Sequence, residues 1–241
     1  MSSLCFRVLL IGDPCVGKTS LMQIMTKQAI NNTVPTVGVD FGIYKFDDAD
    51  IKRINADLST PISSGKIHVW DASGHERFRT IISNYYRNLD ALLVVCDLTN
   101  RRSFDRITYW LDDFLVRSEE DWHRKAVILI GNKSDLVRQA RSKNAFDRST
   151  ETRSVESANC DATNDDDADR ADAPVTETEL RALSVRLAVP YLITSAKSYL
   201  SGADIIELLL EKLMDRFVER DRKDPVIIDL SQKRNVCCTI I

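Results

Sequence analysis

The sequence lacks the features that mark secreted, membrane-spanning and nucleic-acid-binding proteins. No run approaches the roughly 18 apolar residues that a membrane-spanning helix requires, and no apolar stretch follows Met1 as in a secretory signal. The 6 cysteines have no regular spacing, which argues against a disulfide framework. A net charge of −3 implies no charged partner, and no basic stripe indicates nucleic acid. We therefore expect a cytosolic body in which Cys5, Cys15 and Cys96 are reduced.

The 241 residues have the composition of an ordinary globular protein, with 44% hydrophobic and 29% charged side chains. Apolar runs of strand length alternate with segments of helical periodicity, which is typical of one α/β domain with a mostly parallel sheet covered on both faces. Thr176 and Glu179, three residues apart, predict a capping box at the start of one helix. The predicted strands are 6–11, 37–46, 66–70, 91–96, 126–130 and 191–194. The first predicted helix begins at 20, and the later predicted helices cover 103–115, 179–188 and 204–218.

Two polar insertions interrupt this alternation. Residues 47–64 join two predicted strands and are too long for a tight turn, so they indicate a hairpin with an inserted loop. Within 139–175, the stretch from Asp147 to Ala173 carries nine acidic residues against three arginines, a net charge of −6. It has too few apolar side chains to offset the entropy of ordering. We expect a disordered surface insertion there, with a docking role as the less favoured alternative.

Residues 12–19 fit the phosphate-binding-loop pattern of Gly, four residues, then Gly-Lys-Ser/Thr. An apolar strand precedes them and a helix follows from Ser20, so backbone N–H groups could converge on a phosphate at a helix N-terminus. Lys18 could reach the β- and γ-phosphates, and the Thr19 hydroxyl could ligate Mg²⁺. The segment alone also fits a βα turn that holds no ligand, so its meaning depends on the rest of the chain.

Two segments that follow predicted strands would complete such a site. In Asp71-Ala72-Ser73-Gly74 the carboxylate could hold Mg²⁺ through water, and the Gly74 N–H could meet a γ-phosphate. In Asn132-Lys133-Ser134-Asp135 the Asp135 carboxylate could accept two hydrogen bonds from guanine, which adenine cannot offer, while the Lys133 stem covers the base. Both lie at carboxyl ends of strands, where open α/β sheets bind ligands.

Two weaker signals agree with this interpretation. Ser195-Ala196-Lys197, after the last predicted strand, could present a backbone N–H to guanine O6, and Thr36 in a polar loop could add a second hydroxyl to Mg²⁺. Each segment alone is short enough to occur by chance. Together, in one order and at strand ends, they indicate a guanine-nucleotide site.

With these segments the chain resembles the Ras-like small GTPases and, within them, the Rab family. The Rab resemblance rests on 37–41, 66–70, 77–81, 85–87, 93–99, 103–104 and 110–111, and the whole resemblance runs from Phe6 to about Val218 apart from the two insertions. It implies an α/β fold, a P-loop NTPase G domain over 4–220 with a six-stranded mostly parallel sheet flanked by about five helices. Residues 31–41 and 71–87 would be switch segments ordered by the γ-phosphate.

The resemblance implies a GTP/GDP switch that hydrolyses GTP slowly and recruits effectors in vesicle traffic. Its partners would be an exchange factor, a GTPase-activating protein, effectors, a GDP-dissociation inhibitor and a prenylation escort protein. Mg²⁺ would bind Thr19, Thr36 and, through water, Asp71, and catalysis would involve Lys18, Thr36, Gly74 and His75. The implied nucleotide-binding residues are Gly12, Asp13, Pro14, Cys15, Val16, Gly17, Lys18, Thr19, Ser20, Thr36, Gly74, Asn132, Lys133, Asp135, Ser195, Ala196 and Lys197.

The C-terminal residues 221–241 are polar and end in Cys237-Cys238-Thr239-Ile240-Ile241. The paired cysteines resemble the Rab double-geranylgeranylation signal, and the last four residues also fit a C-a-a-X box. The alternative, two free thiols on a flexible tail, is less favoured. Two prenyl chains satisfy the requirement of two signals for stable anchoring. We expect a lipid-anchored protein on the cytoplasmic face of an endomembrane, with a cytosolic pool.

His75 departs from the family pattern, because this position usually carries a Gln that orients the attacking water. Neutral His also has one donor and one acceptor, but on a rigid ring of different reach. It is either an exposed residue without a special task, a cause of slow intrinsic hydrolysis, or a catalytic group once a partner positions it, as in translational GTPases. The favoured interpretation is slow turnover assisted by an activating protein. The main alternative is a GTP-locked membrane scaffold, and a nucleotide kinase is disfavoured because it would use neither Asp135 nor the prenylation signal.

A second departure predicts fast release of GDP. No aromatic residue lies between Thr19 and Phe41, whereas the family packs one on the guanine ring at the position of Ala29 or Ile30. We expect GDP to leave this chain faster than it leaves relatives that carry the aromatic residue. A chase of fluorescent GDP measures both rates. Slow release from the unmodified chain would contradict the prediction.

Overall fold

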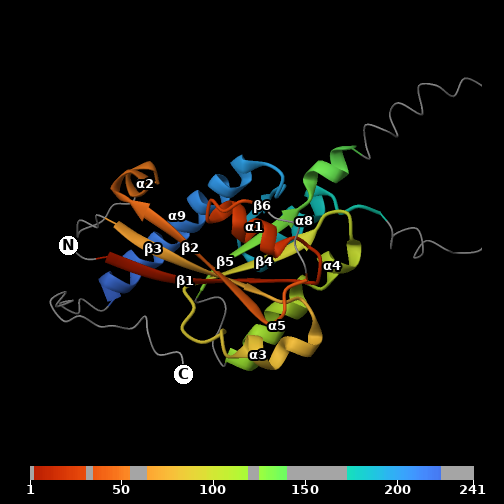
Figure 1. Cartoon of the computed structure of the whole chain (residues 1–241), viewed down its shortest axis with the longest axis horizontal. Helices are drawn as coiled ribbons and strands as arrows, with labels where there is room; N and C mark the ends of the chain where they lie inside the picture. Colours follow the sequence, from red (N-terminus) through yellow and green to blue (C-terminus); the bar gives the residue numbers. More distant parts are fainter. Residues whose placement is uncertain (1–2, 31–34, 55–63, 119–124, 140–172, 224–241) are drawn as a thin grey trace, which may run out of the picture.

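A six-stranded sheet forms the centre of the computed structural model, which describes residues 3–30, 35–54, 64–118, 125–139 and 173–223. The strand order is β2-β3-β1-β4-β5-β6, with β2 and β3 antiparallel and the other neighbours parallel (Figure 1). The predicted six-stranded, mostly parallel α/β sheet is therefore confirmed. The strands are β1 (Ser3–Ile11), β2 (Val39–Asp47), β3 (Ser64–Ala72), β4 (Ala91–Asp97), β5 (Ala126–Asn132) and β6 (Tyr191–Ile193).

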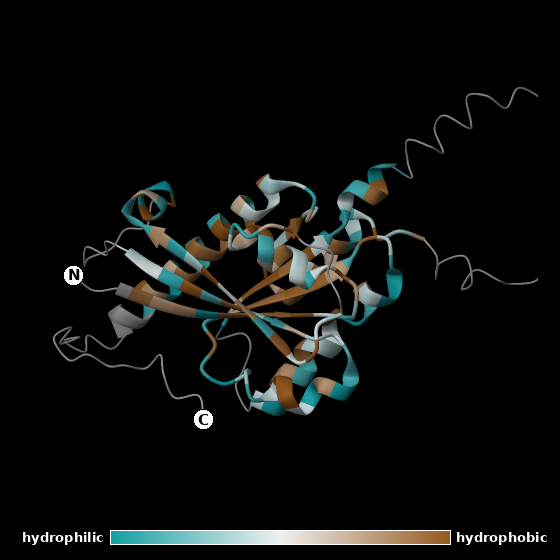
Figure 2. Cartoon of the chain, in the orientation of Figure 1, coloured by the Kyte–Doolittle hydropathy of each residue, from teal (hydrophilic) through white to brown (hydrophobic). Residues whose placement is uncertain are grey.

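Helices cover both faces of the sheet, because the central strands are apolar on both sides. Val8 and Leu10 of β1 pack on one face and Leu9 and Ile11 on the other, all without exposed surface. Figure 2 shows the same strands as the most hydrophobic part of the chain. One face carries α1 (Lys18–Met25), α2 (Asp48–Arg53) and α9 (Tyr199–Lys223), and the other carries α3 (Arg79–Ser83), α5 (Ile107–Ser118) and α8 (Glu177–Leu187).

Three predicted elements differ in detail from the structure. The loop expected over 47–64 begins with α2, because Asp47 caps the helix through the N–H groups of Ala49 and Asp50 and Ile51 is buried; residues 55–63 lie outside the described part. The helix expected over 103–115 is divided at Arg106 into α4 (Arg101–Asp105) and α5. The last helix starts earlier than expected and runs to Lys223, past the predicted start of the tail at 221.

Two further predictions concern the acidic insertion and the C-terminal tail. Most of the residues in these two segments lie outside the described part. For the acidic insertion, residues 140–172 are not described, whereas Val175 is buried and its N–H donates to Leu98 O at 2.8 Å. Residues 224–241, with Cys237 and Cys238, are also outside the described part. Within the described part, no helix combines the length and the apolar character of a membrane span, and Cys5, Cys15 and Cys96 take part in no disulfide.

The predicted capping box at the start of α8 is confirmed and belongs to a larger contact. Thr176 accepts from the Glu179 N–H, and Glu179 accepts from the Thr176 N–H. The same Glu179 carboxylate accepts two hydrogen bonds from the Arg101 guanidinium, at 2.7 and 3.0 Å. These bonds from Arg101 and Thr176 lower the pKa of Glu179 to about 2. Glu179 therefore fixes the start of α8 against α4.

We expect Glu179→Gln to destabilise the fold by about 1 kcal/mol, since the cap is weakened and a partly exposed ion pair is lost. Because folding lowers the pKa of Glu179 from its ordinary 4.5, the stabilisation is complete above about pH 4.5 and disappears as the pH falls toward 2. Urea unfolding of wild type and variant at pH 7 and pH 3 measures this. Glu177→Gln, which removes a charge from the same helical turn, is the control; equal losses for the two variants would contradict the assignment.

Candidate functional site

The turn from β1 to α1 requires glycine at two points. Gly12 and Gly17 have φ angles of +142° and +97°, which favour glycine. A Cβ at Gly12 would also collide with the carbonyl oxygen of Val95, and a Cβ at Gly17 with the side-chain amide of Asn132. The loop 12–17 is thus pressed against β4 and β5 with its backbone path fixed by packing.

Lys18, the first residue of α1, folds back over this loop. Its ammonium group is buried and donates to Gly12 O at 2.9 Å and Asp13 O at 2.7 Å. Burial lowers the pKa of Lys18 to about 8, although Asp71 and Asp13 oppose the shift. An anion in the loop would favour the charged form of this lysine.

Thr19, Thr36 and Asp71 form an oxygen cluster next to Lys18. The two threonine hydroxyls lie 2.9 Å apart, and both donate to Asp71 Oδ2, Thr36 at 3.2 Å. Asp71 has no exposed surface, its pKa is raised by burial, and its Oδ1 has no hydrogen-bond partner within the described residues. Two hydroxyls and a buried carboxylate with an unpaired oxygen fit Mg²⁺, which binds few protein oxygens and retains water.

A cavity of about 300 Å³ joins the loop to this cluster. Gly74 lines this cavity and packs so closely on the loop that a Cβ there would collide with the Asp13–Pro14 peptide. His75 also lines the cavity, and its N–H donates to Ser73 Oγ at 3.4 Å. The lining consists of Pro14, Cys15, Gly17, Lys18, Thr19, Ser20, Pro35, Thr36, Ala72, Ser73, Gly74, His75 and Lys133.

Asn132, at the end of β5, connects three parts of the site. Its Nδ2 donates to Val16 O at 2.9 Å, and its Oδ1 accepts from the Ala196 N–H at 3.2 Å and from Thr194 Oγ1 at 3.3 Å. The amide is buried, so all of these bonds are made in the protein interior. Asn132 holds the loop and the segment after β6, and the Ala196 N–H that the sequence predicted for a base points at Asn132 in this structure.

Asp135 lies beyond Asn132 with its carboxylate held in place. Ser195 Oγ donates to Asp135 Oδ1 at 2.7 Å, and the Lys197 ammonium lies 2.9 Å from Oδ2. Partial burial alone would raise the pKa of Asp135, but Ser195 and Lys197 together lower it. Lys133 pairs with Asp97 at 2.7 Å, has a φ of +63° and lines the cavity.

Most residues predicted from the sequence thus lie at one edge of the sheet, but not all of them face the cavity. The Asp13 carboxylate points away from it, toward α5. Ile30 is 50% exposed, and neither Ala29 nor Ile30 lines the cavity. Val16 contributes its carbonyl oxygen to Asn132 rather than a side chain to the lining.

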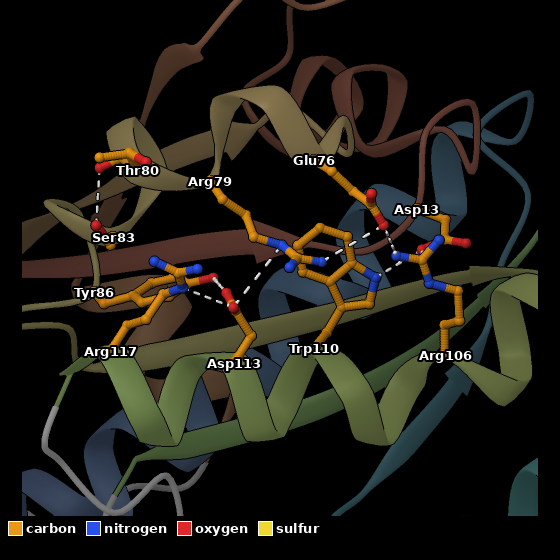
Figure 3. A network of polar contacts seen from close by, with 10 residues as sticks. All are labelled: Asp13, Glu76, Arg79, Thr80, Ser83, Tyr86, Arg106, Trp110, Asp113 and Arg117. Atoms are coloured by element: carbon orange, nitrogen blue, oxygen red, sulfur yellow. Dashed lines mark hydrogen bonds and ion pairs between the residues drawn. The ribbon is translucent and has the colours of Figure 1, made fainter.

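Sequence reasoning missed the partners of Asp13. Its Oδ1 accepts from Trp110 Nε1 at 2.8 Å and lies 3.3 Å from Arg106 Nε, and Arg106 also bonds Glu76 at 3.0 Å (Figure 3). Trp110 and Asp13 are 97 residues apart, so no local pattern predicts the contact. The buried tryptophan in α5 was the available signal, since an indole N–H requires an acceptor.

A second missed feature is an aromatic group on the outer surface of the antiparallel strands. Trp70 of β3 lies between Phe41 of β2 and Tyr85, with ring centroids 4.4 and 5.0 Å apart. Phe41 is 38% exposed. The sequence segments that contain these rings were part of the resemblance, but their mutual contact depends on the pairing of β2 with β3.

The arrangement of a glycine loop, a hydroxyl and carboxylate cluster and an Asn-Lys-Ser-Asp turn at the carboxyl edge of a mostly parallel sheet defines a P-loop nucleotide-binding domain. Residues 7–215 match the model of the Ras family, and the chain belongs to that family. The predicted Ras-like family is therefore confirmed.

Within that family the chain is similar to Rab proteins. It is 38% identical over 132 residues to the Ras-related protein Rab-8B of Homo sapiens, covering 54% of this chain and 56% of the relative. It is likewise 38% identical over 134 residues to Rab-10 of Diplobatis ommata, covering 55% of this chain and 60% of the relative. The chain thus spans a little over half the length of the curated relatives that it matches.

Proposed function

We propose that this protein is a Rab-like molecular switch that binds GTP and GDP, hydrolyses GTP slowly and recruits effectors in vesicle and membrane traffic. The observation that carries the proposal is the single cavity that brings the loop, Lys18, Thr19 and Thr36 together, with Asp135 held at the same sheet edge. The switch domain would extend from residue 4 to the end of α9 at Lys223, and the residues after it would form the tail.

The nucleotide would use each half of the site for a different recognition task. The loop N–H groups and Lys18 neutralise the phosphates, and an anion there also stabilises the charged form of the buried ammonium. The Asp135 carboxylate accepts from the N1–H and the exocyclic amine of guanine, and its contacts with Ser195 and Lys197 keep it charged and oriented. An adenine ring would leave this carboxylate without donors, so the site discriminates by hydrogen bonding.

Mg²⁺ would bind Thr19 and Thr36 directly and Asp71 through water. When bound, the ion neutralises charge that develops between the β- and γ-phosphates. Thr36 reaches the cluster from the 35–38 segment, and Gly74 reaches the loop from the 73–75 segment. Both segments would therefore be held when the γ-phosphate is present and released after hydrolysis.

Hydrolysis would depend on His75, which lines the cavity beside Gly74. Its ring offers one donor and one acceptor but with less reach than Gln, so intrinsic turnover is slow and an activating protein supplies most of the rate. The second candidate function is a GTP-locked membrane scaffold in which His75 gives no useful turnover. The same observation, His at the cavity wall, favours it.

The proposed partners follow from family membership and from two features of the chain. The aromatic group of Phe41, Trp70 and Tyr85 beside the Thr36 segment supports an effector surface that depends on the nucleotide. Cys237 and Cys238 would carry prenyl groups that anchor the protein to the cytoplasmic face of an endomembrane, with an inhibitor-bound cytosolic pool. An exchange factor, an activating protein and a prenylation escort complete the cycle.

Asp135→Asn tests the guanine specificity. Asn presents a donor where guanine also presents donors, so we expect affinity for GDP to fall at least 100-fold, as for other lost polar pairs in buried sites. Affinity for xanthine nucleotides, which offer an acceptor at C2, should rise. Competition against a fluorescent GDP measures both. Asp97→Asn, which alters the partner of Lys133, is the matched control, and unchanged selectivity in Asp135→Asn would contradict the proposed function.

His75→Gln tests the role of position 75, and the nucleotide bound to the purified wild type separates the two candidate functions. We expect the variant to raise single-turnover GTP hydrolysis without a partner, since the longer amide can accept from water and donate to phosphate at once. The nucleotide that copurifies with the wild type is the second readout: GDP supports the cycling switch, and GTP the locked scaffold. An unchanged or lower rate in the variant would contradict the role given to position 75.

A further inference from the structure

Arg106 joins two segments that both border the cavity. Its Nε lies 3.3 Å from Asp13 Oδ1 in the phosphate loop, and its Nη2 donates to Glu76 Oε1 at 3.0 Å (Figure 3). The Arg106 guanidinium lies on the Tyr109 ring, 4.9 Å from its centroid, and its side chain is only 22% exposed. One rigid cation therefore holds two carboxylates from parts of the chain more than sixty residues apart.

The two ends of this contact are not equivalent. Asp13 is buried and has a second donor in Trp110, so α5 holds the loop end firmly. Glu76 is 68% exposed, begins a short 3₁₀ turn (Glu76–Phe78) and directly follows His75. Its other described cation is Arg79, 3.7 Å away. Loss of the Arg106 contact would therefore affect the position of the 74–78 segment more than the position of the phosphate loop.

We propose that Arg106 is a positioning residue that clamps the 74–78 segment to the phosphate loop and so favours the arrangement in which Gly74 and His75 face the cavity. The proposal rests on the proposed function and adds its regulation. Gly74 already packs on the Asp13–Pro14 peptide, and Arg106 bridges the same two segments from the other side. Without Arg106, no cation would join the Asp13 and Glu76 carboxylates, and the segment would separate from the loop.

Arg106 can contact Glu76 only while the 74–78 segment lies on the loop, so this clamp changes the affinity for GTP relative to that for GDP. The γ-phosphate requires Gly74 at the loop, whereas GDP does not, so loss of the clamp lowers affinity for GTP relative to GDP. The loop itself keeps its path, because Gly12, Gly17 and Asn132 fix it independently. Arg106 therefore acts on the choice of nucleotide and not on binding as such.

The test compares affinities for GDP and for a non-hydrolysable GTP analogue by competition against fluorescent GDP, in the full chain with Mg²⁺. We expect Arg106→Gln and Glu76→Gln each to lower the ratio of GTP-analogue to GDP affinity roughly three- to ten-fold. Affinity for GDP should change less than two-fold. The double variant should fall no further than Arg106→Gln alone, because both changes remove one contact. Hydrogen exchange of the 74–83 amides should rise in both single variants.

Arg102→Gln is the matched control. Arg102 and Arg106 both line a hollow of about 570 Å³ beside the loop, and they have the same charge. An equal change of the affinity ratio in Arg102→Gln would mean that positive charge near the loop, and not the Arg106 contact, sets the ratio. That result, or an unchanged ratio in Arg106→Gln, would overturn the proposal. If Arg106→Gln fails to fold, Glu76→Gln on the exposed end decides the question. A wild-type chain that binds neither nucleotide would refute the proposed function, whereas tight binding with equal ratios in all variants refutes only the clamp.

Discussion

The hydrogen bonds of the Asn132 amide hold the phosphate loop, the end of β5 and the segment after β6 in one arrangement. A buried amide left without partners costs roughly 1–3 kcal/mol, so alternative paths for any of these segments are disfavoured. Gly17 lies directly on this amide, which is why a side chain there would disrupt both. The loop is therefore shaped by the protein core, and the binding energy of a ligand is not needed to form it.

Next to this fixed loop, burial shifts the pKa values of two ionisable side chains in opposite directions. Burial lowers the pKa of Lys18 and raises that of Asp71, so each group is moved toward its neutral form. A polyphosphate favours the charged lysine, and a divalent cation favours the charged carboxylate. Because Thr19 and Thr36 both donate to Asp71, the cluster also connects the 35–38 segment to these two charged groups.

The sequence predicted the elements well where the local pattern and the tertiary contacts agree. All six strands and the Thr176–Glu179 cap were found, since apolar runs and capping pairs are local signals. The hairpin predicted around 47–64 is present, but the inserted loop was wrong for its first part, because α2 depends on the burial of Ile51 against the core. The start of α9 was placed too late because its first turn packs against α1, where a Cβ on Gly202 would collide with Ile24 O.

By itself the sequence determined the loop motif, the residues that follow each strand and hence the edge of the sheet where they gather, because strand order along the chain and side-chain chemistry are local properties. The tertiary structure alone decided what each of these side chains touches. Asp13 belongs to the loop motif, yet its carboxylate faces Trp110 of α5 and Arg106 just before that helix, and Asp13 does not line the cavity. Such contacts arise from the packing of α5 on the sheet, which brings residues 97 positions apart within hydrogen-bond distance and leaves no periodic trace in the sequence.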